Sequence, residues 1–208
     1  MIRSRKFNQE IKKMKVDSFK EIIKKSALSL FKDKGLNNVS TRDLNVKLNI
    51  SRSHMYHYYS TWEELKLDAI KYMLDQDIVD FLSDDEYSNT LNSSEKIYRF
   101  LDYHLPKAPS THWVLYLEIW PLSARDQSYA ELIHSNFIQW HGILESIISQ
   151  GIDRSDFCKV NTLSAARKIL AMVDGYSSVL IVEYTEEKRE EFIKEIFHYS
   201  IQTVTSNE

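Results

Sequence analysis

Side chains that suit contact with a nucleic acid gather between residues 40 and 59. Hydroxyl and phenol groups match phosphate oxygens, whereas guanidinium and imidazole groups match base edges in the major groove of duplex DNA. We expect Arg52 and His54 to read base edges. Phosphate contacts are expected from Thr41, Ser51, Tyr56 and His57. The full set of candidate DNA-binding residues is Ser40, Thr41, Arg42, Ser51, Arg52, Ser53, His54, Tyr56 and His57.

Two short amphipathic segments carry these residues. The first starts at Ser40 or Thr41 and the second at Ser51, residues whose side-chain oxygens commonly cap helix starts. Asn49 lies between them and tolerates a positive φ. Apolar residues that would fill the angle between two such helices are Leu44, Leu48, Ile50, Met55 and Tyr58. This pattern predicts a helix-turn-helix, and a helical hairpin with a polar surface is the alternative on spacing alone.

A second group of side chains is suited to enclosing a small organic molecule. Aromatic and large apolar residues recur at three-, four- and seven-residue spacing on three segments, so each set falls on one helix face. Glu118 would add negative charge for a cationic ligand held against aromatic faces. The candidate ligand-binding residues are Trp113, Tyr116, Glu118, Trp120, Phe137, Trp140, His141, Met172 and Tyr176. The alternative is that these aromatic residues only fill the core.

Composition argues against several other functions. The chain has only 4 Gly and 3 Pro, too few for Gly-rich phosphate loops or for a turn-rich β fold. Its single cysteine, Cys158, cannot form an internal disulfide, which fits a reducing compartment. The seven histidines include no His-x-x-x-His pair, and no catalytic signature is present, so we predict no metal, no cofactor and no catalytic residue. An all-α enzyme, or a protein-interaction module that does not bind DNA, is the alternative function.

Charge is divided unevenly along the chain. The net charge of −3 hides a basic first part, residues 1–71, with 16 Lys and Arg against 8 Asp and Glu. Residues 72–208 carry 11 against 22. This asymmetry favours a polyanionic partner for the first part. No apolar run exceeds five residues, so we expect no membrane span and a cytoplasmic protein.

The elements that must position these residues are predicted to be helices throughout. Residues 1–15 are polar and basic and are expected to form a flexible arm, and residues 83–92 an acidic loop. Helical spacing of apolar residues predicts nine helices: about 16–34, two short helices starting near residues 40 and 51, and 62–81, 93–105, 110–123, 127–150, 161–183 and 186–204. We expect Gly35 and Gly151 to end two of them and Pro121 to distort the last turn of another.

Residues 22–70 resemble the DNA-binding domain of the tetracycline-repressor (TetR) family of bacterial regulators. The family's first helix ends in a small-residue and Leu-Phe pattern before a glycine, matched by Ala27, Leu30, Phe31 and Gly35. Its T-x-R-D-I-A helix is matched at residues 40–44, its G-V-S-x-G-x-L-Y-x-H/Y-F turn and recognition helix at 49–59, and its K-E-E-L at 63–65. The sequence departs from the family at Asn45, Asn49, Ser53 and Trp62, where relatives often have a small residue, glycine, glycine and lysine, respectively.

This resemblance implies a domain organisation. It implies an N-terminal three-helix DNA-binding domain and a helical body that dimerises and usually holds an effector. We therefore expect a basic arm over residues 1–15, a helix-turn-helix DNA-binding domain over 16–61, and an effector-binding and dimerisation domain over 62–208. Residues 113–181, notably Asp174-Gly175, loosely resemble the C-terminal domain of the choline-responsive repressors of this family.

Apolar stripes near the C-terminus predict a homodimer through residues 161–204. One stripe comprises Leu163, Ala166, Leu170, Val173, Ser177 and Leu180, and the other comprises Phe192, Ile196 and Tyr199. The alternative is that both helices only close the core of the monomer. The predicted function is that of a ligand-responsive transcriptional regulator, a repressor that binds a palindromic double-stranded DNA operator as a homodimer and is released by a small organic effector.

Overall fold

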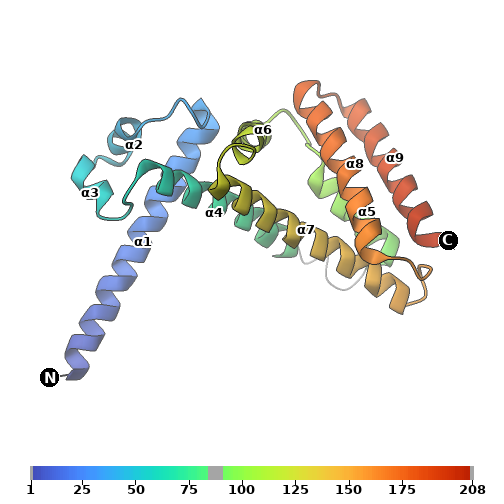
Figure 1. Cartoon of the computed structure of the whole chain (residues 1–208), viewed down its shortest axis with the longest axis horizontal. Helices are drawn as coiled ribbons and strands as arrows, with labels where there is room; N and C mark the ends of the chain where they lie inside the picture. Colours follow the sequence, from blue (N-terminus) through green and yellow to red (C-terminus); the bar gives the residue numbers. More distant parts are fainter. Residues whose placement is uncertain (1, 84–90, 207–208) are drawn as a thin grey trace. The chain divides into compact units, whose positions relative to one another are not determined.

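The computed structural model describes residues 2–83 and 91–206, with side chains described from Asp17 onward, and every regular element within them is a helix (Figure 1). The helices are α1 (Ile2–Lys34), α2 (Thr41–Leu48), α3 (Arg52–Tyr56), α4 (Trp62–Ser83), α5 (Ser93–His104), α6 (Thr111–Ser123), α7 (Gln127–Asp153), α8 (Thr162–Val182) and α9 (Glu186–Thr205). The predicted all-α class is confirmed. Within the same residues, no helix is both long enough and apolar enough to span a membrane.

The first helix differs from the prediction at its start. α1 begins at Ile2, whereas residues 1–15 were expected to be a flexible arm. Residues 2–15 contain no Gly or Pro and six Lys and Arg, residues with a good helix propensity, so the sequence does not interrupt the helix there. At the other end, Gly35 has a φ of 87° and ends α1 as predicted, because a left-handed residue after a helix favours glycine.

The chain divides into two compact units, Met1–Asp75 and Gln76–Glu208. The division falls within α4, later than the predicted boundary between residues 61 and 62. The first unit packs α1, α2, α3 and the start of α4 around fully buried side chains: Ile23, Ala27, Leu44, Met55, Leu65, Ala69 and Ile70.

In the second unit, α7 packs against α5, α6 and α8, and α9 packs against α5 and α8. The side chains at its centre are fully buried: Ile97, Phe100, Leu101, Leu144, Ile148, Ala166, Ile169, Leu180 and Ile196. Together with Ile78 and Phe81 of α4, residues from five helices therefore meet in one core.

The apolar stripe that was predicted to make the dimer faces the core of its own unit. The buried members of the α8 stripe are Ala166, Leu170, Val173, Ser177 and Leu180, and only Leu163 is exposed. In the α9 stripe Ile196 is fully buried, and Phe192 and Tyr199 are half-buried. These residues therefore close the core of their own unit, which was the alternative interpretation.

Gly151 has a packing role rather than the predicted role of ending a helix. α7 continues past it to Asp153, and a Cβ atom at position 151 would lie 2.1 Å from Cδ2 of the buried Phe157 ring. Only a residue without a side chain leaves room for this ring. Pro121 likewise lies inside α6, which runs to Ser123.

Replacing Gly151 with alanine is expected to lower the free energy of unfolding by about 1–3 kcal/mol, because overpacking displaces the Phe157 ring and outweighs the better helix propensity of alanine. The matched control is Gly142→Ala on the same helix, where a Cβ atom would have no neighbour within 4 Å. That variant should be stabilised by up to about 1 kcal/mol. Urea denaturation measures both changes, and equal effects would contradict the packing role.

The segment between α5 and α6 is tied to the last two helices through its backbone carbonyl groups. The hydroxyl of Ser177 donates to the carbonyl oxygen of His104 at 3.1 Å. The buried Arg189 donates from Nε to the carbonyl oxygen of Pro106 and from Nη2 to that of Asp102, both at 3.0 Å. Side chains of α8 and α9 thus hold the backbone at the end of α5 and just beyond it.

Candidate functional site

Local hydrogen bonds fix the start of α2. The backbone N–H of Asp43 donates to Oγ of Ser40 at 3.4 Å, and the Asp43 carboxylate accepts the backbone N–H of Ser40 at 2.9 Å, which together form a capping box. The ammonium group of Lys34 also donates to this carboxylate at 2.7 Å. The hydrogen bonds from Lys34 and then Ser40 hold the pKa of Asp43 well below its usual range. The start of α2 is therefore tied to the end of α1.

The turn and the second helix follow the predicted pattern. Asn49 adopts the left-handed conformation, with φ 52° and ψ 47°. Ser51 then accepts the backbone N–H of His54 at 3.1 Å and so caps α3. α3 is short and ends at Tyr56, so Tyr58, which was expected to fill the angle between the two helices, lies just beyond it.

Buried contacts fix the inner side of α3. Met55 is fully buried and Tyr59, just beyond the helix, is 1% exposed. The Tyr59 hydroxyl donates to the Asp68 carboxylate at 2.6 Å, and the ammonium group of Lys20 lies 4.6 Å from the centre of the Tyr59 ring. Burial, with the nearby Asp68, raises the pKa of the Tyr59 phenol. α1 and α4 thereby hold α3 in one orientation.

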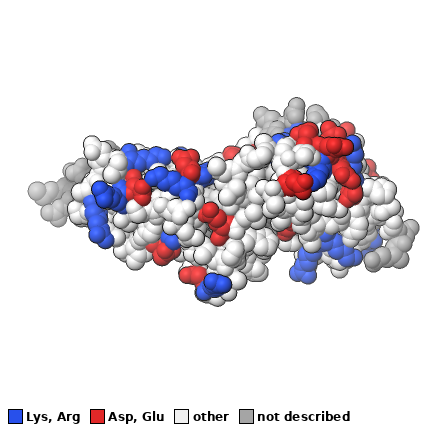
Figure 2. Space-filling model, turned by 90° about the horizontal axis from the view of Figure 1, so that it is seen from above, with Lys and Arg blue, Asp and Glu red and all other residues white. Residues whose placement is uncertain are grey.

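The predicted DNA-binding side chains lie on the outer side of this helix pair. Thr41 is half-buried, and the exposed ones are Ser40, Arg42, Ser51, Arg52, Ser53, His54, Tyr56 and His57. The guanidinium group of Arg52 lies over the Tyr56 ring, 5.6 Å from its centre. Ser40 differs from the others because its hydroxyl is engaged in the cap. Figure 2 shows Lys and Arg side chains spread over the surface of the first unit, at the left of the view.

Two residues near the start of α4 are engaged inside the first unit. Trp62, which stands where relatives often have lysine, packs its ring edge-on against Phe31 at 5.9 Å. Lys66 is largely buried, with its ammonium group 2.5 Å from the Glu63 carboxylate. Trp62 therefore packs in the fold, and Lys66 is committed to an ion pair.

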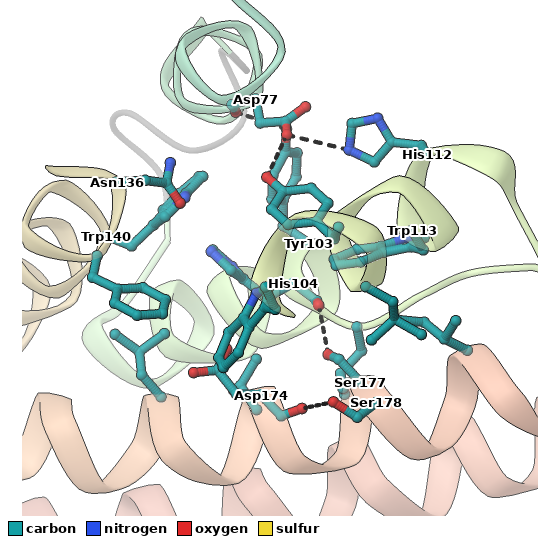
Figure 3. Close-up of a pocket in the computed structure, with 18 of the residues that line it drawn as sticks. Asp77, Tyr103, His104, His112, Trp113, Asn136, Trp140, Asp174, Ser177 and Ser178 are labelled. Carbon is teal, nitrogen blue, oxygen red and sulfur yellow. Dashed lines mark hydrogen bonds and ion pairs between the residues drawn. The ribbon is translucent and has the colours of Figure 1, made fainter. Parts of the chain in front are cut away.

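The second unit contains a cavity of about 710 Å³, a volume typical of sites for small organic molecules (Figure 3). Its wall is built by α5, α6, α7 and α8, together with Asp77 of α4. Six of the nine predicted ligand-binding residues line it: Trp113, Tyr116, Trp120, Phe137, Trp140 and His141.

The other three predicted residues lie outside the lining that the structure describes. Glu118 is on α6 but is not part of the cavity wall. Met172 packs against the apolar core, and the Tyr176 ring stacks on Phe192 at 4.2 Å. The face of α8 that lines the cavity carries Leu170, Val173, Asp174, Ser177, Ser178 and Ile181, and Met172 and Tyr176 lie on other faces of this helix.

Asp77 is the centre of a hydrogen-bonded cluster at one side of the cavity. Its carboxylate accepts the Tyr116 hydroxyl at 2.7 Å and lies 3.2 Å from Nε2 of His112, and its backbone carbonyl accepts the Tyr103 hydroxyl at 2.7 Å (Figure 3). Burial, with the nearby Asp77, raises the pKa of both tyrosines. The Asp77 carboxylate is therefore already engaged by groups of the protein.

Two buried atoms of the cavity wall have no hydrogen-bond partner within the described residues. They are Nε2 of His104 and Nδ2 of Asn136, whose side chain is 6% exposed. Nδ1 of His104 lies 2.8 Å from the carbonyl oxygen of Phe100, and since a carbonyl only accepts, this nitrogen carries the proton. Burial lowers the pKa of His104 to about 4, so the ring is neutral at pH 7 and Nε2 is an acceptor.

Asp174 brings negative charge to the cavity. Burial raises the pKa of its carboxyl to about 6, and the nearby His141 acts in the opposite direction. Above that pH the carboxylate is charged in a cavity that six Phe, Tyr and Trp side chains help to line. This combination suits a small organic cation, because aromatic faces and a carboxylate both attract positive charge.

Two models of known protein families match this chain. The family model described as "Bacterial regulatory proteins, tetR family" matches residues 23–69. The model described as "BetI-type transcriptional repressor, C-terminal" matches residues 94–202, more than half of the chain. The chain belongs to the TetR family. The helix-turn-helix lies within the first match, and apart from Asp77 the cavity wall lies within the second.

Solved structures of other regulators share the fold of this TetR-family chain. A transcriptional regulator from Saccharomonospora viridis in complex with choline has a TM-score of 0.78 at 15% identity, covering 92% of this chain and 100% of that one. A TetR regulator from Haloarcula marismortui has a TM-score of 0.80 at 17% identity, with 91% and 100% covered. One from Cytophaga hutchinsonii has 0.79 at 16%, with 93% and 98% covered. No curated protein sequence matches significantly.

Sequence reasoning missed the polar groups of the cavity in this TetR-family chain. His104 and Asn136 each stand at helical spacing from buried apolar residues, and this signal could have marked them as inward-facing. Asp174 follows the apolar run 169–173 but was noted only as part of a resemblance. No feature of the sequence separates Asp77 from its neighbours Asp75 and Asp80.

Proposed function

We propose that this TetR-family chain is a transcriptional repressor, not an enzyme, that binds a palindromic operator as a homodimer in the cytoplasm and is released by a small organic cation. One observation supports this proposal: the same chain contains a DNA-binding motif and a ligand-sized cavity. The motif is an exposed, capped helix-turn-helix, and the cavity has a volume of about 710 Å³ and is lined by aromatic side chains and a carboxylate. An effector must favour one conformational state over another, since equal affinity for both shifts nothing.

The DNA contacts are assigned by side-chain chemistry. We assign Arg52 and His54 to base edges, and their exposure on α3 supports this assignment. The hydroxyl groups of Thr41, Ser51 and Tyr56, together with His57, are assigned to phosphates. The first turn of α2 also presents Arg42, and Ser53 lies beside Ser51 with 3.0 Å between their hydroxyl oxygens.

Replacing Arg52 with alanine is expected to cost about 1–3 kcal/mol of operator affinity per half-site and to relax base preference at one position in each half-site. The reason is that a bidentate contact to a base edge carries sequence information, whereas a phosphate contact does not. Fluorescence anisotropy with the operator and with random duplex measures the change. Lys71→Ala, which removes an exposed charge elsewhere in the first unit, is the control. Equal losses on operator and random DNA would make Arg52 a phosphate contact.

The choice of effector class rests on which carboxylate is free to pair with it. Asp77 is engaged by Tyr116 and His112, so Asp174 is left to face a cation. Glu118, the residue expected from the sequence to supply the charge, does not line the cavity. The S. viridis regulator of the same fold is described in complex with choline, a small cation of this class.

The dimer is proposed on the outward face of α8 instead of the stripe predicted from the sequence. Val179 is 44% exposed and Val182 is 82% exposed on this face. Gly175 is exposed, and a Cβ atom there would meet nothing within 4 Å, so no contact within the chain requires a glycine. A glycine inside a helix lowers stability by about 1 kcal/mol relative to alanine. The presence of a glycine at position 175 is explained if a partner helix approaches closely there.

A further inference from the structure

The two side chains that carry atoms without partners, His104 and Asn136, both line the cavity, and Figure 3 labels them. His104 comes from the end of α5 and Asn136 from α7. The His104 ring packs edge-on against Trp140 at 4.2 Å, and Trp140 is one helical turn from Asn136 on α7. One acceptor and one donor are therefore presented by neighbouring helices.

Leaving both atoms unsatisfied is costly for the protein. A buried polar group without a hydrogen bond loses its hydration and gains nothing in return, so such atoms in native proteins usually meet a ligand or a bound water. The Asn136 side chain is 94% buried, and the His104 ring lies between Phe100, at 4.1 Å, and Trp140. The two side chains are thus held in place by packing, independently of any hydrogen bond to each other.

We infer that His104 and Asn136 form a subsite that recognises a hydroxyl group of the effector, which donates its proton to Nε2 of His104 and accepts Nδ2–H of Asn136. A hydroxyl is the smallest organic group that can act as donor and acceptor at once. A methyl group in its place would leave both protein atoms unsatisfied. This inference rests on the proposed function, because it names a feature of the molecule that the same cavity binds.

Two pairs of probes test the subsite, each pair differing only by a hydroxyl replaced with a methyl group. The cationic pair is choline and propyltrimethylammonium, and the neutral pair is 2-phenylethanol and propylbenzene. Calorimetry on the full chain should show that the hydroxyl member of a pair binds at least about tenfold more tightly than the methyl member. The reason is that the methyl compound leaves two buried polar atoms without hydrogen bonds. The neutral pair separates hydroxyl recognition from recognition of charge.

The variants Asn136→Leu and His104→Phe should each reduce the preference for the hydroxyl member to below about twofold. Asn136→Leu is expected to fold, because it replaces an unsatisfied buried amide with an apolar group of similar size. The matched controls are Gln139→Leu, an exposed amide on α7, and His198→Phe, an exposed imidazole on α9, and both should keep the full preference.

The results separate this inference from the proposed function. Tight cation binding with no preference for the hydroxyl would overturn the subsite and leave the cationic effector standing. Preference in the neutral pair alone would support the subsite and refute the cationic effector. Equal binding within both pairs would mean that the two atoms hold a structural water, and failure of both hydroxyl compounds to bind at millimolar concentration would also overturn the inference.

Discussion

Replacing Asp174 with asparagine is expected to weaken binding of choline by a factor on the order of 10² while making the ligand-free protein more stable. The affinity falls because the cation loses the carboxylate that is free to face it in a largely aromatic cavity. Stability rises because a neutral amide avoids burying a charge. The pKa of Asp174 is raised from 3.8 to about 6, which corresponds to about 1–3 kcal/mol at pH 7.5.

The sign of the pH dependence follows from this raised pKa. Between about pH 4 and pH 6 the folded protein binds a proton at Asp174 that the unfolded chain has released, so the Asp174 contribution is most favourable at low pH and is lost as pH rises through 6. The stability advantage of the asparagine variant should therefore be full above pH 6 and vanish below about pH 4. Choline affinity of the natural chain should fall as the pH drops below 6. His141 of α7 faces the same carboxyl and opposes its protonation.

Urea denaturation at several pH values and calorimetry with choline measure the two effects. The matched control is Asp77→Asn, because that carboxylate is also in the cavity wall but accepts the Tyr116 hydroxyl and faces His112. The control should be destabilised, by about 1–3 kcal/mol, because it breaks hydrogen bonds to a charged group. An Asp174→Asn variant that binds choline normally, or that is less stable than the natural chain at pH 7.5, would contradict the assignment.

Replacing Gly175 with leucine is expected to convert the homodimer to a monomer at micromolar concentration and to weaken operator binding by about 10²–10⁴-fold. The leucine side chain would project from the outward face of α8 and prevent close approach of a second helix. Operator affinity falls with it because two linked recognition helices bind far more tightly than one. The monomer itself should fold, since position 175 is exposed, a Cβ atom there has no neighbour within 4 Å, and leucine has a better helix propensity than glycine.

Light scattering measures the oligomeric state, and anisotropy measures operator affinity. Gly142→Leu is the matched control, because Gly142 is also exposed in the middle of a helix and a Cβ atom there has no neighbour within 4 Å. That variant should remain dimeric. A natural chain that is monomeric at micromolar concentration, or a Gly175→Leu variant that still dimerises, would show that α8 does not form the interface.

The helix-turn-helix could be predicted because its geometry is set by local interactions. Capping by Ser40 and Ser51 and the left-handed Asn49 each depend on side chains within three residues of the backbone groups that they affect. Such signals are readable from a single sequence. The start of α1 could not be predicted, because a segment without Gly, Pro or a capping residue gives no sign of where a helix begins.

The cavity could be predicted only in part because it depends on how five helices pack. Spacing placed Trp113, Tyr116 and Trp120 on one face of α6, and the structure confirms that this face lines the cavity. Periodicity shows that a face is buried but not what it is buried against. The spacing of the α8 stripe was therefore predicted correctly, but the stripe packs in the core of its own unit and not against a second chain. The contact between His104 of α5 and Trp140 of α7 had no signal in the sequence.

The way the α5–α6 segment is anchored bears on how such a protein can evolve. Ser177 and Arg189 hold this part of the cavity wall through the backbone carbonyl groups of Asp102, His104 and Pro106. Every amino acid supplies a carbonyl oxygen, so a substitution at His104 or Pro106 keeps that anchor, whereas Asp102 also pairs its carboxylate with Arg189. The wall can therefore exchange its side chains, and with them its preferred molecule, while its backbone stays in place.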